Sequence, residues 1–437
     1  MRISVIGCGY LGAVHAAAMT KLGHEVVAVD VDAQKVAQLS QGIAPFFEPG
    51  LPEILAEALA SGRLTFTTDI SEVAGAQLHF IAVGTPQSAD SSAADLTYVN
   101  AAVDALIPHL ADTDVVVGKS TVPVGTAAGL ADKIARAGSG ATLCWNPEFL
   151  REGHAIKDTI SPDRLVFGIA QGAGHDRALD ALSAVYEPII ASGTPVVVTD
   201  LATAELVKTA ANAFLATKIS FINAMGEIAE ATGANVTQLA DAIGFDDRIG
   251  RKFLNAGVGF GGGCLPKDIR AFSARAQELG LGSSVAFLGE IDSINLRQRH
   301  RVVNKVETAL GGALAGARVA VLGLAFKPHS DDVRDSPALD VAMELSARGA
   351  HVVAYDPEAI GPATKRFPEL VTSETLEQAL QKADIAVLLT EWPQFVQLDP
   401  TAVKALMASP RIIDARNVLS AEVWRDAGFT YDSMGRP

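Results

Sequence analysis

Short apolar runs alternate with glycine turns and helical stretches from the first residues of the chain. The run at residues 2–7 leads into a glycine turn at residues 7–12 and an alanine-rich stretch that ends near Leu22, and a second apolar run covers residues 24–29. Apolar runs of this length indicate buried strands, and the alanine-rich stretch indicates a helix. Because the two kinds of element alternate, the pattern predicts a parallel, doubly wound sheet.

The alternation continues and then begins again late in the chain. The further strands predicted in the first region lie at residues 78–83, 115–119 and 143–145. A second α/β region starts near Ala317, and its predicted strands lie at residues 318–323, 351–355 and 383–389. Only Gly323 follows the first strand of this region, without the spaced glycines of residues 7–12. Residues 86–95, rich in Ser, Ala and Asp, predict a surface loop.

A long uninterrupted stretch separates the two regions. Residues 201–232 contain no Pro and one Gly, and their apolar residues, such as Leu206, Leu215 and Ile222, recur at helical spacing. The stretch predicts one long helix, which is also expected to carry a homodimer interface. The fold expected is α/β, with two Rossmann-like doubly wound domains joined by a long central helix. The domain boundaries expected are residues 1–200, 201–305 and 306–437.

Composition limits the classes of function. The 437 residues are 49% hydrophobic and 19% charged, which is typical of a globular multidomain chain. No apolar run approaches the roughly 20 residues that span a membrane, and the N-terminal run resembles a strand more than a signal peptide, so we expect a cytoplasmic protein without membrane association. The formal net charge of −15 argues against nucleic-acid binding.

Three cysteines, Cys8, Cys144 and Cys264, are too few and too scattered for a disulfide framework. Any chemically important cysteine is therefore expected to act as a thiol. Most such cysteines are small buried hydrophobic residues, and this is the expectation for Cys8 and Cys144.

The first glycine turn has the spacing of a dinucleotide site. Gly7, Gly9 and Gly12 follow a predicted strand and open a predicted helix, and Asp30 ends the next strand. Glycines at this spacing permit a tight turn and the approach of a pyrophosphate to helix-terminal N–H groups. A carboxylate at Asp30 accepts the ribose hydroxyls and repels a 2′-phosphate, which favours NAD over NADP, with Lys35 as a further ribose contact. A chance glycine turn is the alternative, which the flanking strands and Asp30 disfavour. The second region is not expected to bind NAD of its own.

Polar residues follow three of the strands predicted in the first region. Residues 118–126 offer several hydroxyls, and residues 84–86 can be read in the same way. Residues 146–153 bring Glu148 and Glu152 to the same edge, where open α/β proteins bind ligands and where a carboxylate can act as a general base. A polar turn and solvated loop charges are the competing interpretations, and the sequence does not decide between them.

One face of the long predicted helix carries polar residues. Glu205, Lys208 and Asn212 are separated by steps of three and four residues, so they share that face. A solvent-exposed face is one interpretation. The other is that Lys208 and Asn212 point inward, where a lysine can stabilise an oxyanion.

The most informative segment lies at residues 257–268. Five glycines in seven residues precede Cys264, and Lys267 and Asp268 follow it. Glycines permit the main chain to wrap closely around a ligand, and a neighbouring Lys favours the nucleophilic thiolate. Burial as a small hydrophobic residue explains neither the glycines nor the Lys-Asp pair, so we expect a reactive cysteine here.

Taken in order, these segments resemble the UDP-glucose/GDP-mannose dehydrogenase family over nearly the whole chain. The motifs that carry the resemblance lie at residues 7–12, 119–126, 146–153, 162–166, 259–268, 323–328 and 332–337. No single motif is decisive, whereas together they are highly specific. The chain departs from many relatives at Gly263, where a small hydroxyl residue is expected, and in the loop at residues 88–94. The form of residues 146–153 favours the branch that oxidises UDP-glucose over the GDP-mannose and UDP-N-acetylhexosamine branches.

The resemblance implies a four-electron oxidation of the C6 alcohol of a sugar nucleotide to a carboxylate, which consumes two NAD⁺ and water. Cys264 is implied as the nucleophile that forms first a thiohemiacetal and then a thioester. Glu148 is implied to activate the hydrolytic water and Thr121 to hold it. The other residues with an implied catalytic role, as oxyanion stabilisers or proton relay, are Lys208, Asn212 and Asp268.

The resemblance also implies the binding residues. NAD is the cofactor implied, no metal is expected, and the cofactor contacts are Gly7, Gly9, Tyr10, Leu11, Gly12, Asp30, Lys35, Thr85, Thr121, Glu152, Lys267 and Arg334. The UDP-sugar contacts are Glu148, Phe149, Leu150, Arg151, Lys208, Asn212, Arg248, Phe253, Gly257, Gly261, Lys327 and Arg416. The three expected domains then bind NAD, carry the cysteine loop and bind the sugar nucleotide, in that order.

Two other classes of function compete with this one. An NAD-binding sensor that has kept the fold and lost the chemistry is disfavoured by the presence of Cys264, Lys208, Glu148 and Asp268. An ordinary single-step hydroxyacid dehydrogenase needs no nucleophilic cysteine, so Cys264→Ser is expected to leave its turnover intact.

Overall fold

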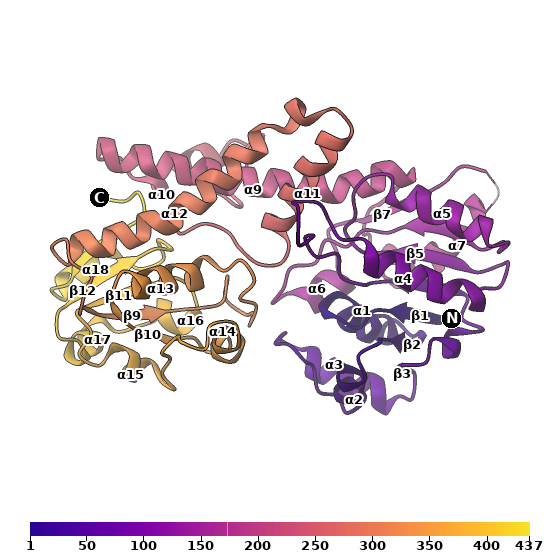
Figure 1. The fold of residues 1–437 in the computed structure, drawn as a ribbon, viewed down its shortest axis with the longest axis horizontal. Helices are drawn as coiled ribbons and strands as arrows, with labels where there is room; N and C mark the ends of the chain where they lie inside the picture. The colour runs from indigo at the N-terminus through magenta and orange to yellow at the C-terminus, as the bar shows by residue number, and fades with distance from the viewer. Residues whose placement is uncertain (173) are drawn as a thin grey trace. The chain divides into compact units, whose positions relative to one another are not determined.

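A computed structural model describes residues 1–172 and 174–437. The chain folds into two compact units, each described here by itself. The N-terminal unit comprises residues 1–211 and 274–279, and the C-terminal unit comprises residues 212–273 and 280–437. The expected mixed α/β class, with a sheet in each part and a long helix between them in sequence, is confirmed (Figure 1).

An eight-stranded sheet forms the centre of the N-terminal unit. Its strands are β1 (Arg2–Ile6), β2 (Glu25–Val29), β3 (Leu64–Thr67), β4 (Leu78–Ile81), β5 (Val115–Gly118), β6 (Thr142–Trp145), β7 (Leu165–Ile169) and β8 (Val196–Thr199). Their order in the sheet is β3-β2-β1-β4-β5-β6-β7-β8, and every pair is parallel except β6 with β7. The first six strands thus have the order of a dinucleotide-binding sheet. Strands β3, β7 and β8 were not among the strands predicted from the pattern.

Both faces of this sheet are covered by helices, which explains why its strands are almost wholly apolar. One face packs against α1 (Tyr10–Lys21), α3 (Leu51–Ala60) and α7 (His175–Val185). The other face packs against α4 (Thr97–Leu106), α5 (Thr126–Arg136) and the start of α9. The shorter helices of the unit are α2 (Ala33–Ser40), α6 (Ala155–Ile160) and α8 (Glu187–Ala191). Residues 86–95 form an irregular loop, as predicted.

The helix predicted at residues 201–232 is a single helix, α9 (Leu201–Thr232). Its residues up to Ala211 belong to the N-terminal unit, and those from Asn212 onward belong to the C-terminal unit. The next helices of the chain are α10 (Val236–Gly244), α11 (Leu265–Glu278) and α12 (Phe287–Ala309). No helix among the described residues is long and apolar enough to cross a membrane.

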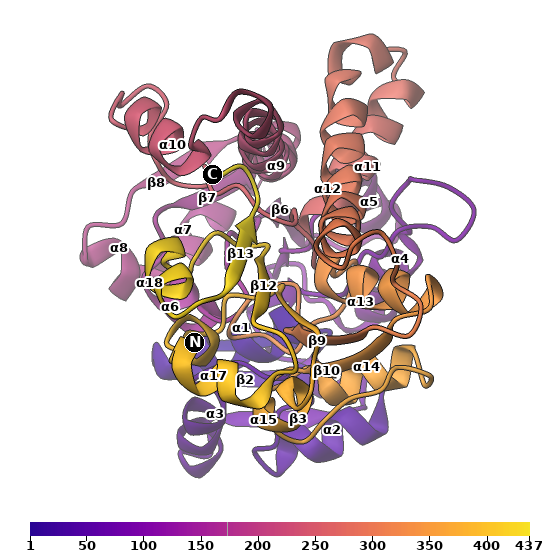
Figure 2. The ribbon, with the colours of Figure 1, turned by 90° about the vertical axis from the view of Figure 1, so that its left-hand side faces the viewer.

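The C-terminal unit contains a five-stranded parallel sheet with the order β10-β9-β11-β12-β13. Its strands are β9 (Arg318–Leu322), β10 (His351–Tyr355), β11 (Ile385–Leu388), β12 (Arg411–Asp414) and β13 (Thr430–Ser433), of which the last two were not predicted. Its helices are α13 (Pro337–Ala347), α14 (Ile360–Arg366), α15 (Leu376–Leu380), α16 (Pro393–Val396), α17 (Pro400–Leu406) and α18 (Ala421–Asp426). Helix α12 packs against α13 and β12 (Figure 2).

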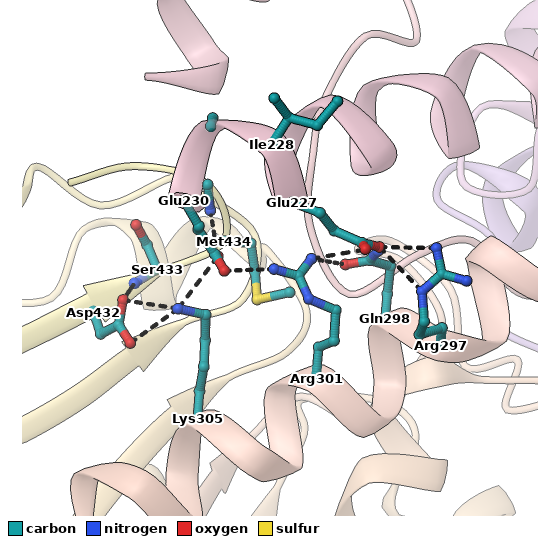
Figure 3. Close-up of polar contacts among 12 residues, drawn as sticks. Glu227, Ile228, Glu230, Arg297, Gln298, Arg301, Lys305, Asp432, Ser433 and Met434 are labelled. Carbon is teal, nitrogen blue, oxygen red and sulfur yellow. Dashed lines mark hydrogen bonds and ion pairs between the residues drawn. The ribbon is translucent and has the colours of Figure 1, made fainter. Parts of the chain in front are cut away.

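Charged side chains tie α9, α12 and the end of the chain together within the C-terminal unit (Figure 3). Glu230 on α9 pairs with Arg301 and Lys305 on α12, and Lys305 also pairs with Asp432 of β13. The Glu230 oxygen that pairs with Lys305, Oε1, also accepts the N–H of Gly435, 2.8 Å away. Partly exposed ion pairs contribute about 1 kcal/mol or less each to the stability of a protein. The main effect of this network is therefore to fix the position of the C-terminal residues.

Candidate functional site

The glycine turn after β1 has the geometry of a nucleotide-binding turn. Gly7 has a φ of +94°, and a Cβ there would lie 2.7 Å from Val83 Cγ1. A Cβ at Gly12 would lie 1.7 Å from the carbonyl oxygen of Gly7, so the helix start and the turn approach too closely for any side chain. A Cβ at Gly9 would meet no atom within 4 Å. The outer two glycines are therefore required by protein packing, and the middle one leaves open space beside the first N–H groups of α1, as a pyrophosphate requires.

Asp30 lies directly beside this turn. It is buried, and its carboxylate accepts hydrogen bonds from the backbone N–H groups of Cys8 and Asp32 at 2.8 and 2.9 Å. The Lys35 ammonium pairs with it at 3.0 Å. The carboxylate is thus fixed at the end of β2 next to the open side of the turn. A carboxylate in this position can accept hydrogen bonds from the free ribose hydroxyls of a dinucleotide. NAD has these free hydroxyls, so the placement fits NAD.

Glu48 connects the turn to the loop at residues 146–153, and the sequence analysis missed it. This buried carboxylate accepts the Tyr10 hydroxyl and the N–H groups of Gly153 and Ala155, the latter two at 2.6 and 2.7 Å. Its partners are about 40 and 105 residues away in sequence. It holds the first turn of α6 and the end of the loop against the start of α1.

The carboxyl edge of the sheet gathers polar residues, as predicted. The Thr85 hydroxyl donates to the carbonyl oxygen of Thr121 at 2.7 Å, and this bond joins the two predicted hydroxyl segments. Glu205 on α9 accepts the N–H groups of Gly125 and Ala127 at 2.8 and 2.6 Å. The N-cap residue of α5 is a glycine, which has no side chain to accept these N–H groups. Glu205 therefore caps the N-terminus of α5 from another helix.

The polar face of α9 points inward. Glu205, Lys208 and Asn212 are 2%, 5% and 7% exposed, which excludes the solvent-exposed interpretation. In the N-terminal unit the Lys208 ammonium lies 3.2 Å from Glu148 Oε1 and 5.6 Å from the centre of the Phe149 ring. The other oxygen of Glu148 accepts the N–H of its loop neighbour two residues on, at 2.7 Å. The two residues implied as base and oxyanion stabiliser are thus in direct contact and largely shielded from water.

Lys119, the first residue of the motif at residues 119–126, is a buried cation at the base of the loop at residues 146–153. Its ammonium donates to Asn146 Oδ1 at 2.8 Å and to the Tyr186 hydroxyl at 3.2 Å. Asn146, the first residue of the loop, also donates to the carbonyl oxygen of Val166 at 2.9 Å. Burial lowers the pKa of Lys119 to about 7, although the charge of Glu148 opposes the shift.

In the C-terminal unit, four of the predicted residues gather where α11 begins. Cys264 is exposed, and its carbonyl oxygen accepts the N–H of Asp268 at 2.9 Å, the first hydrogen bond of the helix. Asp268 is buried and accepts the Asn212 amide and the Lys267 ammonium, both at 2.6 Å. Cys264 therefore lies at a helix N-terminus, where the partial positive charge of the helix dipole stabilises an anion such as a thiolate. The Lys267 ammonium forms an ion pair with Asp268, which partly neutralises its positive charge.

The glycines before Cys264 lie close to other parts of the protein. A Cβ at Gly257 would lie 2.7 Å from the carbonyl oxygen of Ala415, and one at Gly261 would lie 2.3 Å from that of Asp335. Cβ atoms at Gly259, Gly262 and Gly263 would likewise lie 2.4–2.7 Å from protein side chains. The main chain thus packs closely against neighbouring parts of the C-terminal unit, which by itself requires glycine at these positions. That the loop also contacts a ligand stays a prediction.

Several predicted binding residues are engaged by the protein itself. Arg248 is exposed and pairs with Asp246 two residues earlier, and Arg151 pairs with Asp158 of α6. Phe253 has a φ of +67°, a strained conformation for a bulky residue.

Arg416 fixes the cysteine loop to the C-terminal sheet. Its guanidinium donates to the carbonyl oxygens of Gly259, Phe326 and Leu389 at 2.7–3.1 Å. Of the other predicted residues, Lys327 lies over the Phe326 ring in this region. The guanidinium of Arg334 packs against the position of Gly263.

A glycine turn shaped for a dinucleotide and a shielded lysine–carboxylate pair in the N-terminal unit are features of an NAD-dependent dehydrogenase. Models of the UDP-glucose/GDP-mannose dehydrogenase family match the chain in three successive stretches. They are the NAD binding domain at residues 1–190, the central domain at residues 202–297 and the UDP binding domain at residues 320–421. The chain belongs to this family.

Similar proteins carry narrower names. The UDP-glucose 6-dehydrogenase of Rhizobium meliloti (strain 1021) is 43% identical over 440 residues, which is 100% of both chains. The UDP-glucose 6-dehydrogenase TuaD of Bacillus subtilis (strain 168) is also 43% identical, over 100% of this chain and 93% of its own. The solved UDP-glucose dehydrogenase of Pyrobaculum islandicum is 39% identical with a TM-score of 0.89, over 100% of this chain and 98% of its own.

Proposed function

We propose that this protein catalyses the NAD-dependent oxidation of the C6 alcohol of UDP-glucose to the carboxylate of UDP-glucuronate. The observation that carries the proposal is the exposed thiol of Cys264 at the start of α11, with Asn212, Lys267 and Asp268 gathered beside it. A dehydrogenase that stops at the aldehyde needs no such nucleophile. The similarity to proteins named UDP-glucose 6-dehydrogenase over full length supports the choice of sugar nucleotide.

The overall reaction converts one alcohol, two NAD⁺ and one water into one carboxylate, two NADH and three protons. NAD bound at the glycine turn would supply the hydride acceptor for each of the two oxidations. The Cys264 thiolate attacks the aldehyde carbon, so that a C–S bond forms and the aldehyde oxygen becomes the hydroxyl of a thiohemiacetal. Oxidation of this adduct gives a thioester. Water then attacks the thioester carbon, the C–S bond breaks, and the sulfur leaves as a thiolate.

The remaining catalytic residues act on charge and protons. Lys208, which is shielded from water, stabilises the negative charge that develops on the substrate oxygen, and the Asn212 amide donates to the same oxygen. Glu148 removes a proton from the attacking water, which Thr121 helps to hold. Asp268 orients Asn212 and exchanges protons with water.

The binding residues are proposed from the same family pattern. For NAD they are Gly7, Gly9, Tyr10, Leu11, Gly12, Asp30, Lys35, Thr85, Thr121, Glu152, Lys267 and Arg334. For the UDP-sugar they are Glu148, Phe149, Leu150, Arg151, Lys208, Asn212, Arg248, Phe253, Gly257, Gly261, Lys327 and Arg416. Local Lys and Arg residues neutralise the diphosphate despite the acidic composition of the whole chain.

Kinetics with a panel of sugar nucleotides test the proposal. Purified protein is given NAD⁺ with UDP-glucose, UDP-galactose, GDP-mannose or UDP-N-acetylglucosamine, and NADH is followed by absorbance. We expect UDP-glucose to have the highest kcat/KM, and NADP⁺ to replace NAD⁺ poorly. A higher kcat/KM with another sugar would reassign the substrate within the family, and absence of reaction with all four would reject the activity.

We also infer that the protein forms a homodimer through α9. Phe214, Phe221 and Ile228 are 66%, 46% and 55% exposed and recur every seven residues, so they form one apolar stripe on the helix. Figure 3 shows Ile228 pointing away from the ion pairs that Glu230 makes with α12. A second copy of the same stripe is the occupant that we propose. Light scattering should give twice the chain mass for the wild type and one chain mass for Phe221→Glu. Phe245→Glu, which changes an exposed residue outside the stripe, is the control and should also give twice the chain mass. A monomeric wild type contradicts the inference.

A cytoplasmic location is proposed on the basis of the cysteines. Cys8 and Cys144 are buried thiols, and Cys264 acts as a thiolate in the proposed reaction. Thiols persist in a reducing compartment. Fractionation of cells that produce the protein should recover it with cytoplasmic markers.

A further inference from the structure

Asn295 on α12 holds the main chain of the cysteine loop at two points. Its side chain is fully buried, and Oδ1 accepts the N–H of Phe260 at 2.7 Å while Nδ2 donates to the carbonyl oxygen of Phe260 at 2.9 Å. The amide therefore satisfies both backbone groups of one residue. Gly259 makes this approach possible, because a Cβ there would lie 2.4 Å from Asn295 Oδ1.

The side chain of Phe260 is fixed as firmly as its backbone. It is buried in a small apolar cluster with Ala216 of α9, Ile269 of α11 and Leu288 and Ile291 of α12. Phe260 is thus anchored four residues before Cys264 by both its main chain and its ring. A shift of this residue away from α12 requires the loss of both hydrogen bonds to Asn295 and of a longer one, 3.5 Å, from Arg299 to its carbonyl oxygen.

Helix α12 also fixes the chain on the other side of Cys264. Arg270, six residues after the cysteine, pairs with Asp292 of α12 and with Asp335, at 2.8 and 2.9 Å. One turn of α12 separates Asp292 from Asn295. The same helix therefore holds the segment that carries Cys264 both before and after the thiol.

We propose that Asn295 is a positioning residue that sets the location of the Cys264 thiol by clamping Phe260 to α12. This inference rests on the proposed function of Cys264 as the nucleophile. Asn295 itself touches neither substrate nor cofactor in this proposal. Its loss lets the loop shift while α12 and the apolar cluster remain.

The test compares Asn295→Leu with Gln298→Leu, a matched control on the same helix. Gln298 is 1% exposed and bonds to Glu227 and Arg301 (Figure 3), neither of which belongs to the cysteine loop. Both variants lose buried amide hydrogen bonds and should have similarly lowered Tm. We expect Asn295→Leu alone to lower kcat with UDP-glucose, by about 10- to 100-fold, because a displacement of about 1 Å in a reacting group costs up to about 100-fold in rate. The KM for NAD⁺ should stay within about twofold in both variants.

Alkylation provides a readout that does not depend on turnover. The variants are treated with iodoacetamide without substrate, and peptide mass spectrometry follows the rate at Cys264, with buried Cys8 and Cys144 as indicators of unfolding. We expect a changed rate at Cys264 in Asn295→Leu and the wild-type rate in Gln298→Leu. Asn295→Asp keeps the acceptor for the Phe260 N–H, so its kcat and its alkylation rate should lie between those of the wild type and of Asn295→Leu. If Asn295→Leu does not fold, Asn295→Asp takes its place in the comparison.

Equal kcat values and equal alkylation rates in the two Leu variants would overturn the proposal. A wild-type protein that does not oxidise UDP-glucose would instead reject the proposed function. In that case the alkylation comparison still decides whether Asn295 positions the thiol.

Discussion

Replacement of Lys119 by Met should change how stability depends on pH. The folded protein lowers the pKa of this buried lysine from 10.5 to about 7, chiefly through desolvation. Between these two values the unfolded chain binds a proton that the folded protein has released, so the contribution of Lys119 to stability rises with pH. From pH 7 to pH 9 the rise amounts to about 2 kcal/mol, since each pKa unit corresponds to about 1.4 kcal/mol and the folded form is half protonated at the start. Met fills similar space and does not titrate.

Urea unfolding at pH 7, 8 and 9 measures this effect. Trp145 of β6 is buried in the N-terminal unit, and with Trp392 and Trp424 replaced by Phe its fluorescence reports that unit alone. The free energy of unfolding of Lys119→Met minus that of the parent should fall by about 2 kcal/mol from pH 7 to pH 9. For Lys133→Met, which removes a lysine at the surface of α5, the difference should stay constant. A constant difference for Lys119→Met as well would refute the reasoning that desolvation governs this lysine.

Three further predictions follow from the N-terminal unit. Asp30→Ala should raise the KM for NAD⁺ about tenfold with little change in kcat, because it removes about one net hydrogen bond to a charged group, and initial rates at varied NAD⁺ test this. Glu148→Gln should lower kcat by 10²- to 10⁴-fold and leave a covalent sugar adduct detectable by intact mass, and a normal kcat would exclude it as the base. Burial of Asp114 opposes ionisation, but hydrogen bonds from His79 and the N–H of Ala111 outweigh it and lower its pKa. The ionised Asp114 therefore stabilises the folded protein above its unfolded pKa of about 4, and this stabilisation is lost as pH falls through the lower pKa of the folded protein. Asp114→Asn removes the titrating group. The urea midpoint of this variant should therefore depend less on pH between 5 and 3 than that of the wild type.

Local patterns made much of the fold predictable. The strands around the glycine turn and α9 have strong periodic signals within short windows, and the structure confirms them. Strand β7 pairs antiparallel to β6, which is an exception to the parallel sheet that the alternation predicted. The run at β8 is apolar but only four residues long, which is the lower limit for a strand signal.

The site was predictable where a motif carries its own chemistry. Cys264 stands out because glycines and charged residues surround it in sequence. Glu48 and Asn295 carry no such signal, because their partners lie about 105 and 35 residues away and neither type of residue is unusual in its local context. Lys119 resembled an ordinary loop lysine, since only the packed structure shows its burial. The glycines before Cys264 show the same limit, because a sequence does not tell whether close approach is to a ligand or to protein.

The stoichiometry of NADH to sugar tests the central claim most directly. Limiting UDP-glucose is exhausted by wild-type protein in excess NAD⁺, and both NADH and the sugar product are quantified. The account predicts two NADH per sugar, UDP-glucuronate as the product, and failure of Cys264→Ser to reach that ratio. One NADH per sugar with wild-type protein, or two with Cys264→Ser at an undiminished rate, would contradict it.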